Sequence, residues 1–384
     1  MNISEKVAIV GSGEAERNKR MGRRAIHLAL EASQKAIKDS GFNKSQIDGV
    51  LTGYSSVDSE LDFSSRLSQE LGITPKFSSM LSVSGATGCA LVEHAALAIA
   101  SGYCETVLIA WADNRSSGAM RDDYVSKLSE VGSEQFEVPY GPLIPTHYAL
   151  AAQRHMHEFG TTPEQLASVA VTFREHALKN PDAMMKKPIT QEEVLQSKMI
   201  SSPLRLLDCC IVSDFGGALL LTSKKRAKDA KKTPIYLLGM GEGHTHENIM
   251  NAENLMYSGA ITSGRTAFEM AGVTHKDIDV VQLYDCFTIT VLMELEDLGF
   301  CEKGESGFLA ENGYLSLEGE LPANTNGGML SCANGGILHV TEAVTQLRME
   351  GRERQVPNNP EIGLVHGNGG VLSSHVTLIM GRES

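Results

Sequence analysis

The sequence lacks any apolar run that approaches the length of a membrane span. It also lacks a Cys-x-x-Cys pair, and its odd number of cysteines favours neither a disulfide framework nor a zinc knuckle. The segment MNISEKVAIVGSG carries charges at Glu5 and Lys6 and leads directly into a strand, unlike a secretory leader. We therefore expect a cytoplasmic protein with reduced thiols. The seven cysteines are residues 89, 104, 209, 210, 286, 301 and 332.

Positive charge is scarce, with a formal net charge of −13, and this argues against a nucleic-acid partner because such binding needs a basic surface. Two basic runs break the trend. RNKRMGRR at 17–24 is interpreted either as a solvated face or as a site for a polyanion such as a coenzyme phosphate. KKRAKDAKK at 224–232 lies between two strand-like runs and is interpreted as a solvated connector. The candidate cations of the first run are Arg17, Arg20, Arg23 and Arg24.

Complete cofactor and metal motifs are also missing. GSG at 11–13 follows a strand, but Glu16 stands where a dinucleotide fingerprint needs its next glycine. HMH at 155–157 and HTH at 244–246 have no carboxylate or thiol at ligand spacing, so we interpret these histidines as surface or packing residues. We expect no metal in this chain.

A duplicated unit is the most informative feature that is present. Residues 36–50 (AIKDSGFNKSQIDGV) match residues 267–281 (AFEMAGVTHKDIDVV) at a constant offset of 231 residues, as 36 and 267 show. Each segment has the pattern of a helix end, a glycine C-cap, a polar turn and a strand start. The sequence therefore predicts the same αβ element twice.

Strand and helix patterns alternate around this repeat, which indicates layered sheets covered by helices. With 384 residues and 42% hydrophobic content, the chain can form one large core or two fused ones. We expect a first half at 1–114 and 212–232, an inserted helical cap at 115–211, and a second half at 233–384. Two central helices, within 82–102 and near 336–350, would bring the loops GATGC and NTNGGMLSCANGG to one site.

Four motifs in this order resemble the thiolase superfamily over nearly the whole chain, most of all its sterol-carrier-protein-x branch and bacterial relatives. They are PLRLLDCC at 203–210, YDCF at 284–287, NTNGG at 324–328 and HGNGG at 366–370. The resemblance implies a duplicated five-layered αβαβα fold, a dimer, and chemistry on coenzyme A thioesters. Related enzymes include the type that cleaves benzoylsuccinyl-CoA and aldolases that act on steroid side-chain thioesters.

Several catalytic positions of that superfamily are changed in this sequence. Matching the glycines at 88 and 102 puts Gly85 where the family has its nucleophilic cysteine. Tyr284 stands where the family has asparagine or histidine, and His366 matches the late catalytic cysteine or histidine. The family's glycine-histidine-proline loop is replaced by ANG at 333–335, so its oxyanion-hole histidine is missing.

Other residues near the inferred site offer replacements. Cys89 lies four residues after Gly85, on the same helix face, and is either a nucleophile or a small core residue. Cys332 in the shortened loop is the preferred thiol, or else an ordinary loop cysteine. His339 either faces the pocket or packs, and Asn326 and Gly370 are expected to contribute with Gly85 to the oxyanion-binding backbone.

These residues leave three functions open. The first is thiolytic cleavage of a bulky or branched 3-oxoacyl-CoA by CoA, with a thiolate nucleophile, His366 as base and Tyr284 as proton donor. The second is retro-aldol cleavage of a 3-hydroxyacyl-CoA, which needs a base but no covalent intermediate. The third is a non-catalytic scaffold that binds acyl-CoA. By resemblance, we also expect a homodimer that carries two copies of a small OB-fold, zinc-ribbon subunit.

Overall fold

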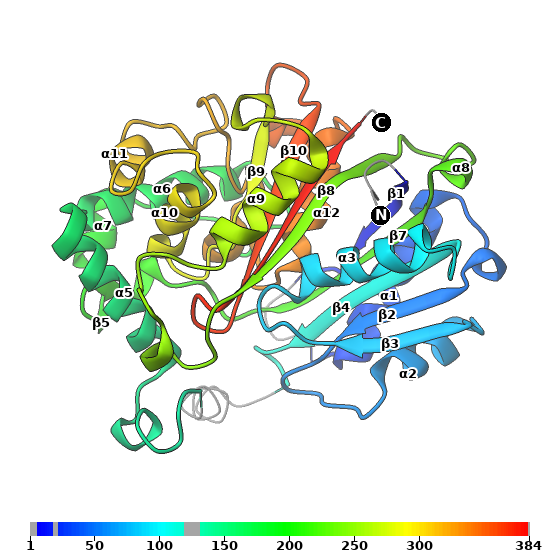
Figure 1. Ribbon diagram of the computed structural model, residues 1–384, viewed down its shortest axis with the longest axis horizontal. Helices are drawn as coiled ribbons and strands as arrows, with labels where there is room; N and C mark the ends of the chain where they lie inside the picture. The colour runs from blue at the N-terminus through cyan, green and yellow to red at the C-terminus, as the bar shows by residue number, and fades with distance from the viewer. Residues whose placement is uncertain (1–5, 18–21, 119–130, 383–384) are drawn as a thin grey trace.

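The computed structural model describes residues 6–17, 22–118 and 131–382 of the chain (Figure 1). Nine strands form one sheet in the order β3-β2-β4-β7-β1-β8-β11-β10-β9. The strands of the first half are β1 (Val7–Glu14), β2 (Gly49–Gly53), β3 (Phe77–Leu81), β4 (Thr106–Asn114) and β7 (Asp214–Ser223). Those of the second half are β8 (Ile235–His244), β9 (Val280–Gln282), β10 (Ile362–Gly369) and β11 (Ser374–Gly381).

The two halves of the sheet meet at β1 and β8, which pair antiparallel through Ala8 with Tyr236 and Ile9 with Ile235. Parallel pairs occur at β2–β3, β2–β4 and β9–β10, and antiparallel pairs at β4–β7, β1–β7, β10–β11 and β8–β11. The strand order on one side of the β1–β8 seam is thus mirrored on the other.

The internal repeat seen in the sequence is visible in the backbone. Helix α1 (Ala25–Ser40) ends at Gly41 with φ of 77°, and α9 (Ala260–Ala271) ends at Gly272 with φ of 69°. Only glycine adopts this left-handed conformation at little cost. A capped 3₁₀ turn follows each helix and leads into β2 or β9. The predicted αβ element therefore occurs twice.

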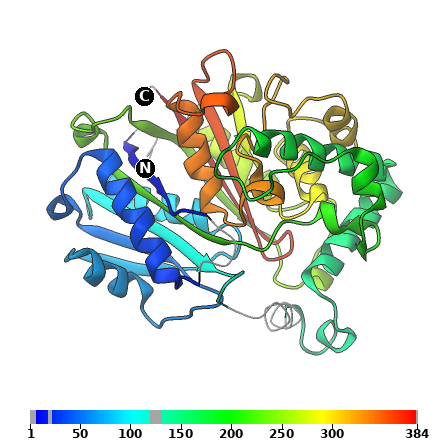
Figure 2. The ribbon, with the colours of Figure 1, turned by 180° about the vertical axis from the view of Figure 1, so that it is seen from behind.

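Helices lie in three layers around the two halves of the sheet (Figures 1 and 2). In the middle, α3 (Thr87–Ala100) and α12 (Ile337–Leu347) pack on each other and on strands of both halves. Outside the first half lie α1 and α2 (Phe63–Leu71), and outside the second half lies α9. Most residues of the central helices are buried because sheet covers them along most of their length, although His94 and Leu97 of α3 are exposed.

The segment between β4 and β7 forms a helical lobe with two helices of the second half. It contains α5 (Ile144–Phe159), α6 (Pro163–Leu178), α7 (Gln191–Gln196) and the short β5–β6 hairpin (Met199–Ser201 with Leu204–Arg205). Helices α10 (Thr288–Asp297) and α11 (Ser306–Glu311) pack against α6. The connector between β7 and β8 contains the short α8 (Lys224–Ala227). The lobe covers the loops that follow β9 and precede α12.

Candidate active site

The N-terminal ends of the two central helices meet, as the sequence pattern indicated. A Cβ added to Gly88 in the first turn of α3 would lie 2.6 Å from Cα of Ile337, the first residue of α12. A Cβ added to Gly336 would meet the carbonyl oxygen of Gly85 and the ring of Tyr284. Glycines are required here because the two helix starts touch through their backbones. The partial positive charges of two helix N-termini are thereby directed at one region.

Tyr284 fills the space above Gly85. A Cβ added to Gly85 would overlap with the hydroxyl and Cζ of Tyr284 and with the backbone oxygen of Asn368. The phenol therefore stands where a side chain at position 85 would project. The absence of a side chain at Gly85 makes room for this tyrosine.

Asp285 organises the loop beside this phenol. It is fully buried, and its two carboxylate oxygens accept the backbone N–H groups of Met329 and Leu330 at 2.9 and 3.0 Å. Oxygen Oδ1 also lies 3.0 Å from Nε2 of His339 on α12. The carboxylate orients the imidazole so that Nδ1 holds the lone pair when Nε2 carries the proton. That Nδ1 is buried and forms no hydrogen bond with the described residues, and the rings of His339 and Tyr284 are 6.1 Å apart.

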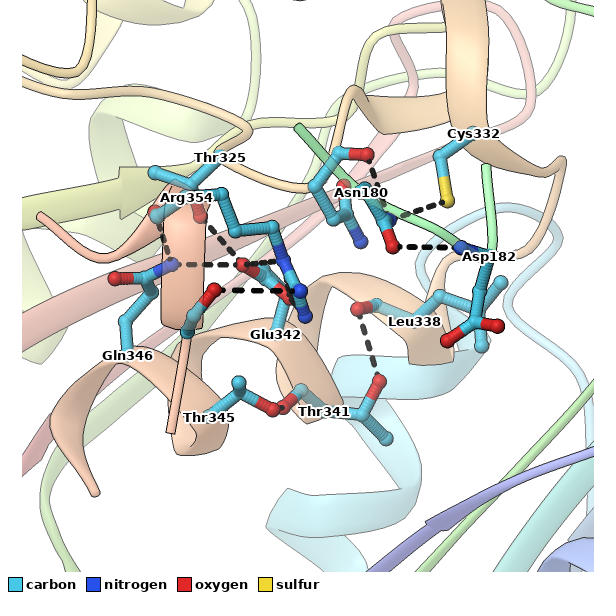
Figure 3. Close-up of polar contacts among 12 residues, drawn as sticks. Asn180, Asp182, Thr325, Cys332, Leu338, Thr341, Glu342, Thr345, Gln346 and Arg354 are labelled. Carbon is cyan, nitrogen blue, oxygen red and sulfur yellow. Dashed lines mark hydrogen bonds and ion pairs between the residues drawn. The ribbon is translucent and has the colours of Figure 1, made fainter. Parts of the chain in front are cut away.

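Cys332 lies on the other side of the same loop. It ends a π-helical turn, Gly328–Cys332, whose first half is held by Asp285. Its thiol accepts a hydrogen bond from Nη1 of Arg17 at 2.8 Å. It accepts a second one from Nδ2 of Asn180 at 3.4 Å (Figure 3). Burial raises the pKa of the Cys332 thiol, and the Arg17 charge opposes this only in part. The placement favours a neutral thiol that anchors the loop to α6 and to the end of β1.

The second thiol candidate, Cys89, is also enclosed. Its side chain is 2% exposed in the core formed by the central helices, and its sulfur lies against Gly367 of β10. Burial, together with the charges of Glu93 and Glu294, raises the pKa of this thiol far above its ordinary value. A thiolate at Cys89 is therefore strongly disfavoured, which matches the core-residue alternative.

His366 does not lie beside Gly85, although its sequence position suggested a base in the pocket. Successive residues of a strand face opposite ways, and it is Gly367 that faces α3. The His366 ring instead lies 2.9 Å from the Thr377 hydroxyl and 2.9 Å from Nδ1 of His375, on the α9 side of the sheet. Burial lowers the pKa of His366 well below its usual range, so the ring is neutral.

Asn326 and Gly370 shape loops of the site through hydrogen bonds. The side-chain oxygen of Asn326 accepts the backbone N–H of Gly328 at 2.8 Å, and its backbone oxygen accepts Nδ2 of Asn180 at 3.0 Å. Gly370 has a φ of 63°, and its carbonyl oxygen accepts the Tyr148 hydroxyl at 3.1 Å. These contacts support an indirect role for both residues, in holding the loops that surround Tyr284.

The described arginines of the RNKRMGRR run are engaged by carboxylates. Arg17 pairs with Glu14, Arg23 with Glu31 at 2.6 Å, and Arg24 with Asp58 at 2.8 Å. Arg20 lies outside the described residues. A coenzyme phosphate would have to compete with these internal ion pairs, so the structure gives the run little support as a phosphate site.

A buried polar network connects the site to the far end of α12 (Figure 3). Glu342 accepts the Thr325 hydroxyl at 2.7 Å and forms an ion pair with Arg354 at 2.9 Å. Two adjoining clefts of about 540 and 190 Å³ open at that end, and both are lined by Lys232, Thr345, Glu350 and Arg354. Neither cleft includes Gly85, Tyr284 or His339.

The described part of the chain contains no cluster of three or more His, Cys, Asp or Glu side chains arranged to hold a metal ion. Within the same residues, no helix combines the length and apolar character needed to cross a membrane. Sequence reasoning missed Asp285 and Asn368 as site residues. Asp285 could have been found as the acidic residue of the YDCF motif. Asn368 contacts Gly85 through its backbone, so its side chain gives no indication in the sequence.

Comparison with known proteins defines the class to which this fold and site belong. Residues 241–382 match the family described as Thiolase C-terminal domain-like. Over 381 residues the chain is 32% identical to the acetyl-CoA acetyltransferase of Methanothermobacter thermautotrophicus, covering 96% of this chain and 98% of that protein. The chain belongs to the thiolase family, and it is a thiolase-like enzyme.

Two further relatives are aldolases. The chain is 35% identical over 392 residues to the steroid side-chain-cleaving aldolase of Thermomonospora curvata, with 98% of each chain covered. The solved structure of an Ltp2-ChsH2(DUF35) aldolase superposes with a TM-score of 0.89 at 34% identity, covering 99% of this chain and 98% of that one. The expected thiolase fold is thus confirmed, and the relatives include both thiolase and aldolase activities.

Proposed function

We propose that this protein cleaves a carbon–carbon bond of an acyl-CoA by a retro-aldol reaction on a 3-hydroxyacyl-CoA. The observation that carries the proposal is the phenol of Tyr284 in the space above Gly85. If Gly85 matches the nucleophile position of thiolases, as the resemblance implies, a proton-transfer group replaces that nucleophile, while Cys89 and Cys332 are buried with raised pKa values. The similarity to an aldolase over 98% of the chain supports the same choice.

The reaction needs one base, one acid and stabilisation of an enolate. The 3-hydroxyl loses its proton, C3 becomes a carbonyl, and the C2–C3 bond breaks. Its electron pair moves to C2 and the thioester, forming an enolate that takes up a proton at C2. The products are a ketone or aldehyde and a shorter acyl-CoA, and no free CoA is consumed.

Tyr284 is proposed to exchange the reacting proton, with His339 as its support. Asp285 orients His339 through a 3.0 Å contact, and the buried Nδ1 provides a proton acceptor behind the phenol. The enolate oxygen would lie at the converging N-termini of α3 and α12, where backbone dipoles favour negative charge.

Thiolysis of a 3-oxoacyl-CoA is the second candidate. It is supported by the similarity to an acetyl-CoA acetyltransferase and by the Arg17 guanidinium 2.8 Å from the Cys332 sulfur, which favours a thiolate. An assay of 3-hydroxyacyl-CoA and 3-oxoacyl-CoA thioesters with bulky or branched acyl chains, each with and without CoA, separates the two reactions. Absence of turnover on the whole panel would instead favour the acyl-CoA-binding scaffold.

A self-association surface is proposed along β3, the edge strand beside α3. Phe77, Leu81 and Val83 are only partly buried against the core, and Leu97 and Tyr103 are 47% and 57% exposed. A second copy that pairs with β3 would satisfy its free edge and cover these side chains. Light scattering should then give twice the 41.4 kDa mass of the chain, and a monomer would contradict this assignment.

We also propose that a small OB-fold subunit with a zinc ribbon completes the coenzyme A site. The similarity to a structure described as an Ltp2-ChsH2(DUF35) aldolase supports a partner. So do the internal ion pairs of Arg17, Arg23 and Arg24, which leave coenzyme A phosphates in need of other cations. Co-expression with such a subunit should give a heterotetramer with tighter CoA binding; equal affinity for CoA without it would contradict the proposal.

A further inference from the structure

Both backbone polar groups of Tyr284 are held by helix α10. The backbone N–H of Tyr284 donates to Oε2 of Glu294 at 2.9 Å, and its carbonyl oxygen accepts the Thr290 hydroxyl at 3.0 Å. The chain turns directly from YDCF into α10, which begins at Thr288. The first two turns of this helix therefore reach back and fix the residue that carries the phenol.

Glu294 is an unusual group to find in this position. It is 1% exposed, and it forms no ion pair with any residue that the structure describes. Burial raises the pKa of Glu294 well above its usual range, and the charges of Asp285 and Asp297 raise it further. Burial therefore favours the protonated form of this side chain, because an isolated charge at this depth would be very costly.

The same carboxyl group also contacts the opposite wall of the site. The side-chain amide of Asn368 favours the charged form of Glu294, which offsets part of the effect of burial on its pKa. Both polar side-chain atoms of Asn368 and Oε1 of Glu294 are buried without a hydrogen-bond partner among the described residues. The backbone oxygen of Asn368 lies over Gly85, next to the Tyr284 hydroxyl.

We propose that Glu294 is a positioning residue of the active site, and that its carboxyl group fixes Tyr284 over Gly85 through the hydrogen bond that it accepts from the Tyr284 backbone N–H. This inference rests on the role proposed for Tyr284. Oxygen Oε2 accepts the Tyr284 N–H, and Oε1 is buried without a hydrogen-bond partner among the described residues, so a proton on the acid is carried on Oε1. Ionisation would place a charge beside Asp285.

The titratable groups around Glu294 come from several elements. Asp297 lies on the same helix, Asp285 and Cys286 precede it, Cys89 faces it from α3, and Tyr148 faces it from α5. Burial or nearby negative charge raises the pKa of Cys89, Tyr148 and Cys286 above their ordinary values. These three groups remain neutral near pH 7. Substitution of Glu294 alone therefore separates its pH response from theirs.

Two substitutions test the proposal through turnover. Glu294→Gln keeps an oxygen for the Tyr284 N–H and cannot ionise, so it should retain most of the kcat and keep it at more alkaline pH than the wild type. Glu294→Ala removes the acceptor of the Tyr284 N–H and should lower kcat by roughly 10²-fold with a much smaller change in KM, because the phenol is misplaced. Glu296→Gln is the matched control, since Glu296 is a buried acid of α10 that contacts His155 and Ser306 instead.

Stability against pH tests the neutral state of Glu294 independently of any reaction. The folded protein retains the proton to higher pH than the unfolded chain, so this residue lowers the free energy of unfolding as pH rises above the ordinary glutamate pKa. Glu294→Gln should therefore gain stability over the wild type, and the gain should grow from pH about 5 to about 8 in urea unfolding.

The two readouts distinguish the possible failures. Equal losses of kcat in Glu294→Gln and Glu294→Ala would overturn the positioning role, as would an unchanged kcat in Glu294→Ala. A stability difference between Glu294→Gln and the wild type that does not vary with pH would overturn the neutral carboxyl group. If both Glu294 results hold but Tyr284→Phe is fully active, the proposed function fails, and with it the catalytic purpose of the hydrogen bond between Glu294 and the Tyr284 N–H.

Discussion

The hydroxyl of Tyr284 occupies the volume that a side chain at Gly85 would need. The two residues are 199 positions apart, as 284 minus 85 shows, and they meet because the two halves of the chain bring the starts of α3 and α12 together. A thiolase fold is thereby combined with a phenol at the meeting point of its two central helices. The consequences for activity follow from this contact.

Substitution of Gly85 should damage the site without creating a thiolase. A cysteine at this position would overlap with the Tyr284 hydroxyl and with the Asn368 oxygen, so the phenol must move. We expect Gly85→Cys and Gly85→Ala to lower retro-aldol turnover by roughly 10²-fold. Steady-state kinetics with acetoacetyl-CoA and CoA provide the check, and efficient thiolysis by Gly85→Cys would contradict the rebuilt site.

Removal of the phenolic hydroxyl should affect chemistry more than binding. Tyr284→Phe is expected to lower kcat by roughly 10²- to 10⁴-fold, the range for loss of a general acid or base, with KM little changed. Tyr236→Phe on β8 is the matched control because that tyrosine lies beside Lys224, away from the site. Similar kcat values for both variants would remove Tyr284 from the mechanism.

His339 should affect turnover through its imidazole, which Asp285 orients. His339→Gln keeps a donor for the Asp285 carboxylate but lacks the second ring nitrogen, so turnover should fall by about 10²-fold or more. The stability of this variant should change little. Asp285→Ala should lose both stability and turnover, because the N–H groups of Met329 and Leu330 lose their acceptor. Full turnover by His339→Gln would show that this histidine has only a packing role.

Cys332 should prove structural. Cys332→Ala removes the acceptor of Arg17 and Asn180 and leaves a small cavity, so it should lower the free energy of unfolding by about 1–3 kcal/mol. Cleavage in the absence of CoA should persist in this variant and in Cys89→Ala. Loss of activity in a folded Cys332→Ala protein, measured below its unfolding temperature, would favour the thiolytic reaction over the retro-aldol reaction.

The pair formed by Glu93 and Glu242 should make stability fall with rising pH. Burial first, and then the charge and hydrogen bond of Glu242, raise the pKa of Glu93 to about 8 from an ordinary value of 4.5. The folded state keeps this proton where the unfolded chain has lost it, so the free energy of unfolding decreases as pH rises from 4.5 to about 8.

Urea unfolding of Glu93→Gln and the wild type across this range measures that contribution. The variant should be more stable, by a margin that increases with pH and then levels off. Glu70→Gln on the exposed face of α2, where Glu70 pairs with Arg66, is the control. A constant difference between Glu93→Gln and the wild type would contradict a shared proton.

The fold was largely predictable because its core strands are apolar and its repeat has no gaps. Capping glycines at 41 and 272 marked the same element twice. Helix α10 was not predicted. All ten of its residues are buried, so it lacks the alternation of apolar and polar faces that identifies a surface helix.

The site was only partly predictable. The resemblance to thiolases suggested Gly85 and Tyr284, and the start of the second central helix suggested His339, but the direction of a side chain on a fully buried strand cannot be taken from hydrophobic alternation. His366 and Gly367 are both buried, and only the packing of Gly367 on Ala86 and Cys89 shows which of them faces α3. The placement of Cys332 depends likewise on a π-helical turn, which has no sequence signature here.

Product analysis without CoA tests the central claim most directly. Wild type, Tyr284→Phe and Cys332→Ala proteins would be incubated with a branched 3-hydroxyacyl-CoA, and thioesters and carbonyl compounds would be separated by liquid chromatography and mass spectrometry. The account predicts one shorter acyl-CoA and one equivalent of ketone or aldehyde from the wild type and Cys332→Ala, and almost none from Tyr284→Phe. Formation of two thioesters from a 3-oxoacyl-CoA, dependent on CoA and abolished in Cys332→Ala but not in Tyr284→Phe, would contradict it.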